Sequence, residues 1–324
     1  MLNIYCAGGA STNIGVRFVQ YIDKKAVGFH MLRPIFIDTS RSNLDSSIPE
    51  SHVYLAHNVD GSGKKRSTNY DLLNESCQEI LHRFKPAEIN LVVHSTSGGT
   101  GSTIGPLLVN ELLARKENVY VLLIASTGTK IEIDNTAKTL KGYENISKKR
   151  NMPVLAFYRE NNTTDMTREV VNKHIEVCIT TLALMYSGEN KELDSADMRH
   201  FLNYHEVTSY TPRLTRLEVY NNNNVLNIPR GQSIISVATL ADEDTIGSAE
   251  LPVEYQTIGF INEEAKKSIN MDLPLHVVTI NGSFNVLIEY LEKKISEFED
   301  KRRISVEKPI VTDKDIATEE GLIL

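Results

Sequence analysis

The stretch HSTSGGTGSTIGPLL, residues 94–108, decides the fold. It begins at the end of the apolar run INLVVHS (89–95), which is typical of a buried strand, and continues into a leucine-rich helical pattern that reaches Leu113. A turn of small residues joins the two, made of Ser97, Gly98, Gly99, Thr100, Gly101 and Ser102. Such a turn between a parallel strand and a helix is the position at which doubly wound sheets bind ligands.

The composition of this turn favours a phosphate group. Backbone N–H groups at the start of a helix are unpaired, and together with the helix dipole they form an anion site. Glycine lets the backbone approach phosphate oxygens, and serine or threonine hydroxyls add donors. We therefore expect valine at Gly99 or Gly101 to abolish nucleotide binding while the chain still folds.

A second turn of the same kind follows the first predicted strand, in AGGASTN (7–13). Gly8, Gly9, Thr12 and Asn13 are its candidate phosphate-binding residues. One glycine turn alone is more often a place where a strand packs tightly against a helix, but two turns at equivalent positions favour a polyphosphate between them. Neither turn fits the dinucleotide pattern GxGxxG or the P-loop pattern GxxxxGK followed by serine or threonine.

The rest of the chain predicts an α/β fold with a doubly wound, Rossmann-like parallel sheet, because strand-like runs alternate with amphipathic helices. Strands are expected at 2–6, 34–38, 52–56, 89–95, 119–126 and 152–158, and helices at 13–23, 70–84 and 134–149. One long helix is expected at 166–186. After Pro212, strand-like runs and a helix at 284–298 predict a second, α+β domain.

The composition of the chain argues against several classes of function. The chain has 324 residues, of which 41% are hydrophobic and 24% charged, as in soluble globular proteins with more than one domain. Its formal net charge of −7 argues against direct binding of nucleic acid or of an anionic membrane surface. No apolar run has the length of a membrane-spanning helix. Three widely separated cysteines without metal-binding spacing indicate reduced thiols in the cytoplasm.

The turn from Ser97 to Ser102 resembles the phosphate-loop signature GGGTGSG of the tubulin/FtsZ superfamily. Its residues Gly98 to Ser102 match that signature, whereas Ser97 and Thr103 stand in place of the outer glycines. The continuation to Leu107 is most similar to the phage tubulins of large bacteriophages. This resemblance extends over nearly the whole chain.

The resemblance implies a division of the chain and a set of partners. It implies a tubulin/FtsZ-like GTPase domain in 1–163, a central helix and catalytic loop in 164–204, an α+β domain in 205–303 and an acidic assembly tail in 304–324. It implies that the chain binds GTP and GDP, with Mg²⁺ held through the phosphates. It also implies a head-to-tail polymer of the chain itself, in which the tail contacts the neighbouring subunit.

Two residues outside the glycine turns are candidate nucleotide contacts. Asn172 falls where the central helix of the superfamily contacts guanine, although its amide alone can pair with guanine or with adenine. Asp134, at the start of the helix predicted for 134–149, can bond a ribose hydroxyl or cap that helix.

Other candidates have weaker support. Asp38 ends a predicted strand and can orient Mg²⁺-bound water or only form a turn. Lys64 and Lys65, where a third phosphate loop is expected, can neutralise phosphate charge or stay solvated. His94 is expected to be structural, as a lone histidine at a strand end usually is.

Asp194 and Asp197 follow the long helix and are the candidate catalytic residues. On the residues alone, Asp194 is a good N-cap and Asp197 faces the helix dipole from the first turn. The resemblance implies a further role. Bacterial members carry the pattern NxDxxD here and insert these acids into the next subunit's pocket to polarise the attacking water. Glu192 stands where that pattern has asparagine.

The sequence therefore favours a GTP-dependent cytoskeletal protein whose dynamic filaments position phage DNA, or its compartment, in the cytoplasm of an infected bacterium. Two alternatives stay open: a nucleotide-binding filament without turnover, which the change at Glu192 allows, and a Rossmann-type dinucleotide enzyme, whose fingerprint both turns lack. The tail mixes acids such as Asp313 with aliphatics such as Ile316, so it can dock on a neighbour or pack on its own subunit.

Overall fold

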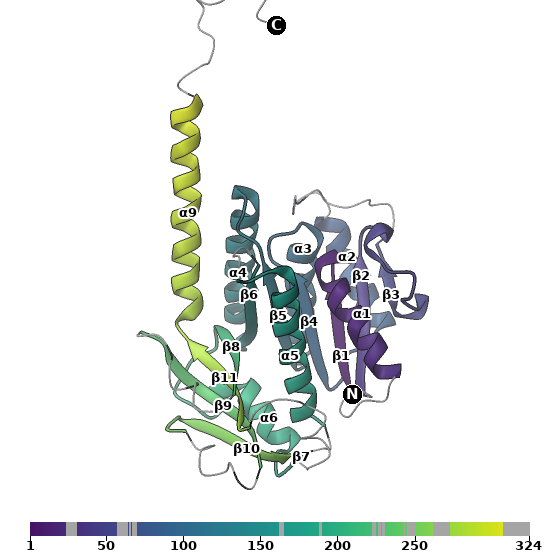
Figure 1. The fold of residues 1–324 in the computed structure, drawn as a ribbon, viewed down its shortest axis with the longest axis vertical. Helices are drawn as coiled ribbons and strands as arrows, with labels where there is room; N and C mark the ends of the chain where they lie inside the picture. Colours follow the sequence, from purple (N-terminus) through teal and green to yellow (C-terminus); the bar gives the residue numbers. More distant parts are fainter. Residues whose placement is uncertain are drawn as a thin grey trace, which may run out of the picture.

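The computed structural model describes residues 1–23, 31–56, 64, 66, 70–161, 165–187, 190–221, 225, 228, 231–242, 244, 251–261 and 273–306. The predicted assembly tail from residue 307 onward lies outside these residues, and so does Lys65 of the expected third phosphate loop. Within the described residues the chain forms one sheet with helices on both faces (Figure 1).

The strands of this sheet are β1 (Leu2–Ala7), β2 (Leu32–Asp38), β3 (Val53–Leu55), β4 (Ile89–Ser95), β5 (Val119–Ala125), β6 (Val154–Glu160), β7 (Asn190–Lys191), β8 (Leu214–Asn221), β9 (Ser233–Ala241), β10 (Tyr255–Ile261) and β11 (Leu275–Asn281). The first six lie close to the ranges that the sequence predicts, whereas β7 falls where no strand is expected. Their spatial order is β3-β2-β1-β4-β5-β6-β8-β11-β9-β10-β7.

The first six strands confirm the predicted doubly wound parallel sheet. Every pair among them is parallel. From β1 the chain proceeds outward to β2 and β3, then returns to β4 and proceeds the other way to β5 and β6. The order therefore reverses between β1 and β4, and such a switch point leaves a crevice at the carboxyl ends of the two strands.

The strands after Pro212 continue the same sheet instead of forming a separate one. β8 pairs in parallel with β6, from Val154 opposite Leu214 to Ala156 opposite Arg216. Beyond β8 the pairing is mixed, because β11 is antiparallel to both β8 and β9 while β10 is parallel to β9. The domain boundaries given above stay a prediction.

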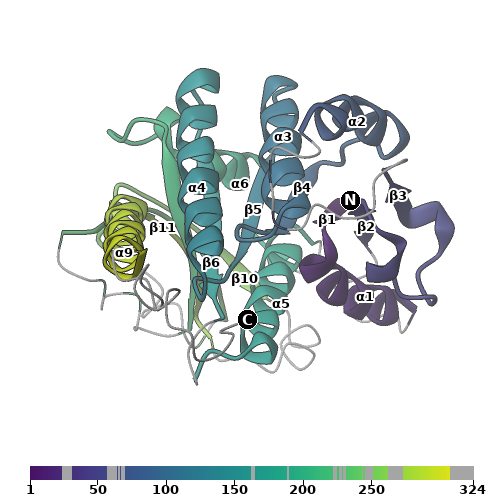
Figure 2. The ribbon, with the colours of Figure 1, turned by 90° about the horizontal axis from the view of Figure 1, so that it is seen from above.

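Helices cover both faces of the sheet, which explains why its parallel strands are mostly apolar. The helices are α1 (Gly9–Asp23), α2 (Tyr70–Arg83), α3 (Thr100–Ala114), α4 (Lys130–Arg150), α5 (Arg168–Met185), α6 (Ser195–Leu202) and α9 (Ser283–Val306). Side chains of α1, α5 and α6 share one buried cluster, and those of α2, α3, α4 and α9 share another. Figure 2 shows α2, α3 and α4 on one side and α1 and α5 on the other.

Three helices begin or end several residues away from their predicted bounds. α1 begins at Gly9, inside the glycine turn at residues 7–13, and α9 continues to Val306, into the segment expected as a tail. α4 begins at Lys130 because Thr129 and Glu132 form a capping box with each other's backbone. The prediction that this helix begins at Asp134 is therefore wrong.

The expectations on the cysteines and on membrane-spanning helices can be compared with the described residues. Cys6, Cys77 and Cys178 are buried there and not joined to one another. Every helix in these parts of the chain is too short or too polar to cross a bilayer.

His94 at the end of β4 is a structural residue, as expected. Its side chain is completely buried, and its Nε2 lies 2.5 Å from the hydroxyl of Tyr143. A Cβ on Gly105 of α3 would lie 2.4 Å from the imidazole, so the ring fills the space that this glycine leaves. Burial lowers the pKa of His94 to about 4.

This pKa predicts a loss of stability in mild acid. An unfolded histidine titrates near pH 6.5, so below that pH the unfolded chain takes up a proton that the folded chain refuses. The stabilising contribution is complete above pH 6.5 and is lost as the pH falls toward 4. Between pH 7 and pH 5 the loss from His94 should be about 2 kcal/mol.

Urea unfolding at the two pH values measures this loss. His94→Gln can still bond Tyr143 through its amide but does not titrate, so its free energy of unfolding should fall less on acidification than that of the wild type. An equal fall in both proteins would contradict the assignment.

Candidate functional site

The two glycine turns meet backbone to backbone at the switch point between β1 and β4. Gly8 has a φ of +84°, and a Cβ there would lie 3.1 Å from the backbone nitrogen of Gly101. A Cβ on Gly101 would lie 2.8 Å from the carbonyl oxygen of Ala7. Both glycines are therefore required for close packing, in addition to any role toward a ligand.

A cavity of about 230 Å³ lies at this junction. It is lined by Ala7, Gly8, Gly9, Ala10, Asp38, Thr39, Asn43, Ser95, Gly98, Gly99, Thr100 and Gly101. α3 starts here without a side-chain cap on its N-cap residue Gly99. Its first N–H groups can therefore bind an anion in the cavity.

The hydroxyl groups in the turn from Ser97 to Ser102 have different partners. That of Thr100 lies 2.9 Å from the hydroxyl of Thr39 at the cavity wall. Ser102, in contrast, donates to the carbonyl oxygens of Gly98 and Gly99 and so closes the turn on itself. Ser97 bonds Ser95 at 3.0 Å and is not among the lining residues.

Asp38 brings a buried carboxylate to the same cavity. It accepts hydrogen bonds from the backbone N–H groups of Thr39 (2.7 Å) and Ser40 (3.2 Å) and from the amide of Asn43 (3.1 Å). Burial raises the pKa of Asp38, and these hydrogen bonds partly offset the effect. Mg²⁺ is usually bound through one or two carboxylates together with substrate phosphates, so the carboxylate of Asp38 has the chemistry of a Mg²⁺ ligand.

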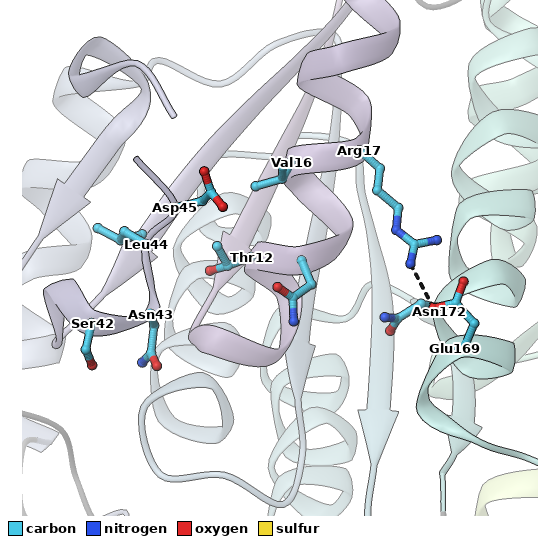
Figure 3. Close-up of a pocket in the computed structure, with 10 residues that line it drawn as sticks. Thr12, Val16, Arg17, Ser42, Asn43, Leu44, Asp45, Glu169 and Asn172 are labelled. Carbon is cyan, nitrogen blue, oxygen red and sulfur yellow. Dashed lines mark hydrogen bonds and ion pairs between the residues drawn. The ribbon is translucent and has the colours of Figure 1, made fainter. Parts of the chain in front are cut away.

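A second, larger pocket of about 630 Å³ adjoins this cavity and shares Asn43 with it. It is lined by Thr12, Asn13, Val16, Arg17, Ser42, Asn43, Leu44, Asp45, Glu169 and Asn172. Figure 3 shows Arg17 of α1 facing Glu169 of α5, while Thr12 and Val16 of α1 point toward the segment of Leu44 and Asp45. The structure thus brings the predicted residues Thr12, Asn13 and Asn172 together in one pocket.

Arg17 is a residue of this pocket that the sequence did not indicate. Its guanidinium donates to Glu169 at 3.0 Å (Figure 3) and also to Glu176 at 2.5 Å, and so joins α1 to α5. Burial raises the pKa of Glu176, and the nearby Arg17 opposes that shift. The acids lie more than 150 residues away in the sequence, so no local pattern could have identified the pair.

Asp134 and Lys64 lie outside the linings of both cavities. Asp134 is in the second turn of α4 and pairs with Lys138 at 2.5 Å. Lys64 pairs with Glu132 at 2.8 Å. The α4 side chain that contacts the glycine turn is Asn135, which donates to the carbonyl oxygen of Ser97 at 3.1 Å.

Asp194 and Asp197 form the cap that the residues alone predict. Asp194 accepts from the N–H groups of Ala196 (2.7 Å) and Asp197 (3.0 Å), and Asp197 accepts from the N–H of Asp194 (3.2 Å). Backbone hydrogen bonds, that of Asp197 first, lower the pKa of Asp194, so it is ionised at neutral pH. Just before the cap, Glu192 has a φ of 70°, a conformation that asparagine adopts more readily than glutamate.

The acid pair lies at the opposite end of α5 from the two pockets. Asn172 is in the first turns of α5, whereas β7 and α6 follow the end of that helix (Figure 1). The 18 residues of α5 correspond to about 27 Å at 1.5 Å per residue. Within one chain, these carboxylates cannot touch a ligand bound at the glycine turns.

No protein-family model matches the chain. Its sequence is, however, similar to phage tubulin-like proteins. The phage tubulin-like protein of Pseudomonas phage phiKZ is 28% identical, over 99% of this chain and 97% of the relative. That of Pseudomonas phage PhiPA3 is 26% identical, over 99% and 98%.

Solved structures agree with these relatives. The protofilament of TubZ from bacteriophage PhiKZ has a TM-score of 0.79 at 26% identity, over 99% of this chain and 98% of that chain. The phage tubulin PhuZ with GDP has a TM-score of 0.80 at 20% identity, over 100% and 99%, which is a likeness of fold.

Proposed function

Because this chain is a tubulin/FtsZ-like phage protein, we propose that it is a GTPase that polymerises head to tail into filaments. One observation carries the proposal: two glycine turns adjoin a single cavity at the switch point of the sheet, beside the pocket of Asn172. In this arrangement the N-terminus of α3 and the glycine turn at residues 7–13 hold the phosphates. The larger pocket takes the sugar and the base.

The polar groups of the site fit a guanine nucleotide with magnesium. Asn172 offers a donor and an acceptor to the base, and Arg17 holds the two helices that enclose it. Mg²⁺ commonly binds through one or two carboxylates together with substrate phosphates, and Asp38 supplies such a carboxylate. The ion neutralises charge on the phosphate groups when it is bound.

Hydrolysis requires a second subunit. A group that orients the attacking water must lie within hydrogen-bond reach of it. Asp194 and Asp197 lie beyond the far end of α5, a helix about 27 Å long whose first residues line the pocket. A head-to-tail contact places the acid pair of one subunit at the pocket of the next. Their negative charge then orients the water for phosphoryl transfer.

In the infected cell, the filaments position phage DNA or the compartment that encloses it. They act in the host cytoplasm. The net charge of −7 is consistent with action that involves no direct contact with nucleic acid or with an anionic membrane.

A second candidate is a filament that binds nucleotide without turnover. The reciprocal hydrogen bonds of Asp194 and Asp197 favour it, since both carboxylates already have partners in the cap. Glu192 favours it too, because it adds negative charge where the bacterial pattern has a neutral amide.

Measuring phosphate release against protein concentration separates these functions. A GTPase completed by its neighbour should be inactive below a threshold concentration and active above it, with filaments visible by electron microscopy over the same range. Filaments without phosphate release would establish the second candidate. Absence of GTP binding would exclude both.

The tail is proposed to contact the neighbouring subunit. α9 extends beyond the rest of the described fold up to the point where the tail begins (Figure 1). Deleting residues 309–324 leaves α9 whole, so the monomer should fold and bind GTP but fail to assemble at concentrations where the full chain does. Light scattering measures assembly. Normal filaments from the shortened chain would exclude this role.

A further inference from the structure

The loop that carries the acid pair rests on strand β10. β7, just before the loop, pairs antiparallel with β10, with Lys191 opposite Phe260. A Cβ on Gly259 of β10 would lie 2.6 Å from the Cβ of Leu193 and 3.3 Å from the carbonyl oxygen of Lys191. The Cβ of Leu193 is fixed to the backbone, so no change of rotamer could relieve this contact. Glycine at 259 therefore lets the loop reach its observed position.

Tyr255, on the same strand, holds the other end of the acid pair. Its hydroxyl donates to the carbonyl oxygen of Asp197 at 3.1 Å, and its ring meets that of His200 edge to face at 6.1 Å. Burial, together with the nearby acids Asp197 and Asp194, raises the pKa of Tyr255 to about 12. The hydroxyl consequently keeps its proton and its role as donor at neutral pH.

The loop has little freedom to accommodate a change on this side. On its other side, the amide of Asn190 donates to the carbonyl oxygens of Leu184 (2.9 Å), Met185 (3.0 Å) and Ser187 (2.9 Å) at the end of α5. Leu193 is 9% exposed and packs in the core. If an added Cβ at position 259 pushes this loop away, we therefore expect the backbone to move between Glu192 and Asp194, the N-cap residue of α6.

The two carboxylates would move together. Each is hydrogen-bonded to the backbone of the other residue, so their separation is fixed by the start of α6. A shift of this helix start relative to β10 displaces both acids from the position they take toward the next subunit.

We propose that Gly259 and Tyr255 are positioning residues for GTP hydrolysis, which set where the acid pair of one subunit stands at the pocket of the next. This inference rests on the proposed function, because it concerns the residues that hold the same two acids in place. Neither residue touches the cavities of its own chain. Their effect should therefore fall on the rate of hydrolysis and not on nucleotide affinity.

The test compares Gly259→Ala with a matched control. Gly259→Ala should lower phosphate release per assembled subunit about tenfold to a hundredfold, because small displacements of a catalytic group have effects of this size. Tyr255→Phe removes one hydrogen bond and should lower it about threefold to tenfold. The control is Gly142→Ala, where an added Cβ has no neighbour within 4 Å, and its rate should be unchanged. GTP affinity of the monomer should stay at the wild-type value in all three.

A double-mutant cycle separates positioning from loss of structure. If Gly259 acts through the acid pair, adding Gly259→Ala to a variant that carries both Asp194→Ala and Asp197→Ala should cause no further fall in the residual rate. A further tenfold fall would mean that Gly259 acts on the structure in general, and would overturn the proposal. So would a wild-type rate in Gly259→Ala.

Two outcomes of the controls are also decisive. If circular dichroism shows that Gly259→Ala does not fold, Tyr255→Phe decides, and a wild-type rate in that variant overturns the proposal. If the wild-type protein itself releases no phosphate when assembled, the proposed function fails first and the positioning role fails with it.

Discussion

Replacing Asp194 with alanine is expected to lower GTP hydrolysis by filaments about a hundredfold or more, while the filaments still form. Phosphoryl transfer depends on positioning and electrostatics, so the loss of the acid that orients the water reduces the rate directly. Nucleotide binding should not change, because the residue lies at the far end of α5 from the pockets. Filaments of the variant should therefore persist longer in GTP.

The cap formed by Asp194 requires a second variant. Alanine also removes the hydrogen bonds that Asp194 accepts from the N–H groups of Ala196 and Asp197, which lowers the stability of α6. Asp194→Ser restores a cap of similar quality but has no charge. If hydrolysis stays low in Asp194→Ser while thermal stability returns, the carboxylate acts on the reaction. If serine restores the rate, the residue is only a helix cap.

Valine at Gly98 is expected to weaken GTP binding about a hundredfold without unfolding the monomer. Gly98 lines the phosphate cavity, and a Cβ there would meet only Ser95, at an ordinary 3.8 Å. The added methyl groups would occupy part of a cavity of about 230 Å³. Fluorescence titration with a labelled GTP analogue measures the affinity, and circular dichroism confirms the fold.

Gly98→Ala adds a smaller side chain than Gly98→Val. Its affinity for GTP should therefore lie between that of Gly98→Val and that of the wild type. Gly101→Val is a poor test, although the sequence suggested it, because a Cβ at 101 would lie 2.8 Å from the carbonyl oxygen of Ala7. That variant should disturb the packing of α3 against β1. Wild-type affinity in a folded Gly98→Val would exclude the turn as the phosphate site.

Much of the fold could be predicted because its signals are local. The alternation of apolar strands and amphipathic helices places β4 at the predicted residues, and small residues mark both turns. The start of α4 could also have been found, since Thr129 and Glu132 have the spacing of a capping box. The prediction there followed the helical pattern and overlooked its cap.

The features that were not predicted depend on contacts between distant segments. The pairing of β8 with β6 joins strands about sixty residues apart. Arg17 reaches Glu169 and Glu176 across the pocket, and Gly259 meets Leu193 only after β7 and β10 have paired. A single sequence carries no pattern that links such partners. The sequence alone likewise does not show that Asn172 and the acid pair lie at opposite ends of α5. That separation follows from the helix as the structure has it.

The central claim is that one subunit binds GTP and the next supplies the acid, and mixing two inactive proteins tests it most directly. Asp194→Ala keeps an intact pocket but lacks the acid, whereas Gly98→Val keeps the acid but lacks the pocket. Phosphate release from an equal mixture should rise well above the sum of the two separate rates, because the acid of one protein can act at the pocket of the other. If the mixture releases phosphate only at the sum of the two separate rates, although the two proteins coassemble, the account is contradicted.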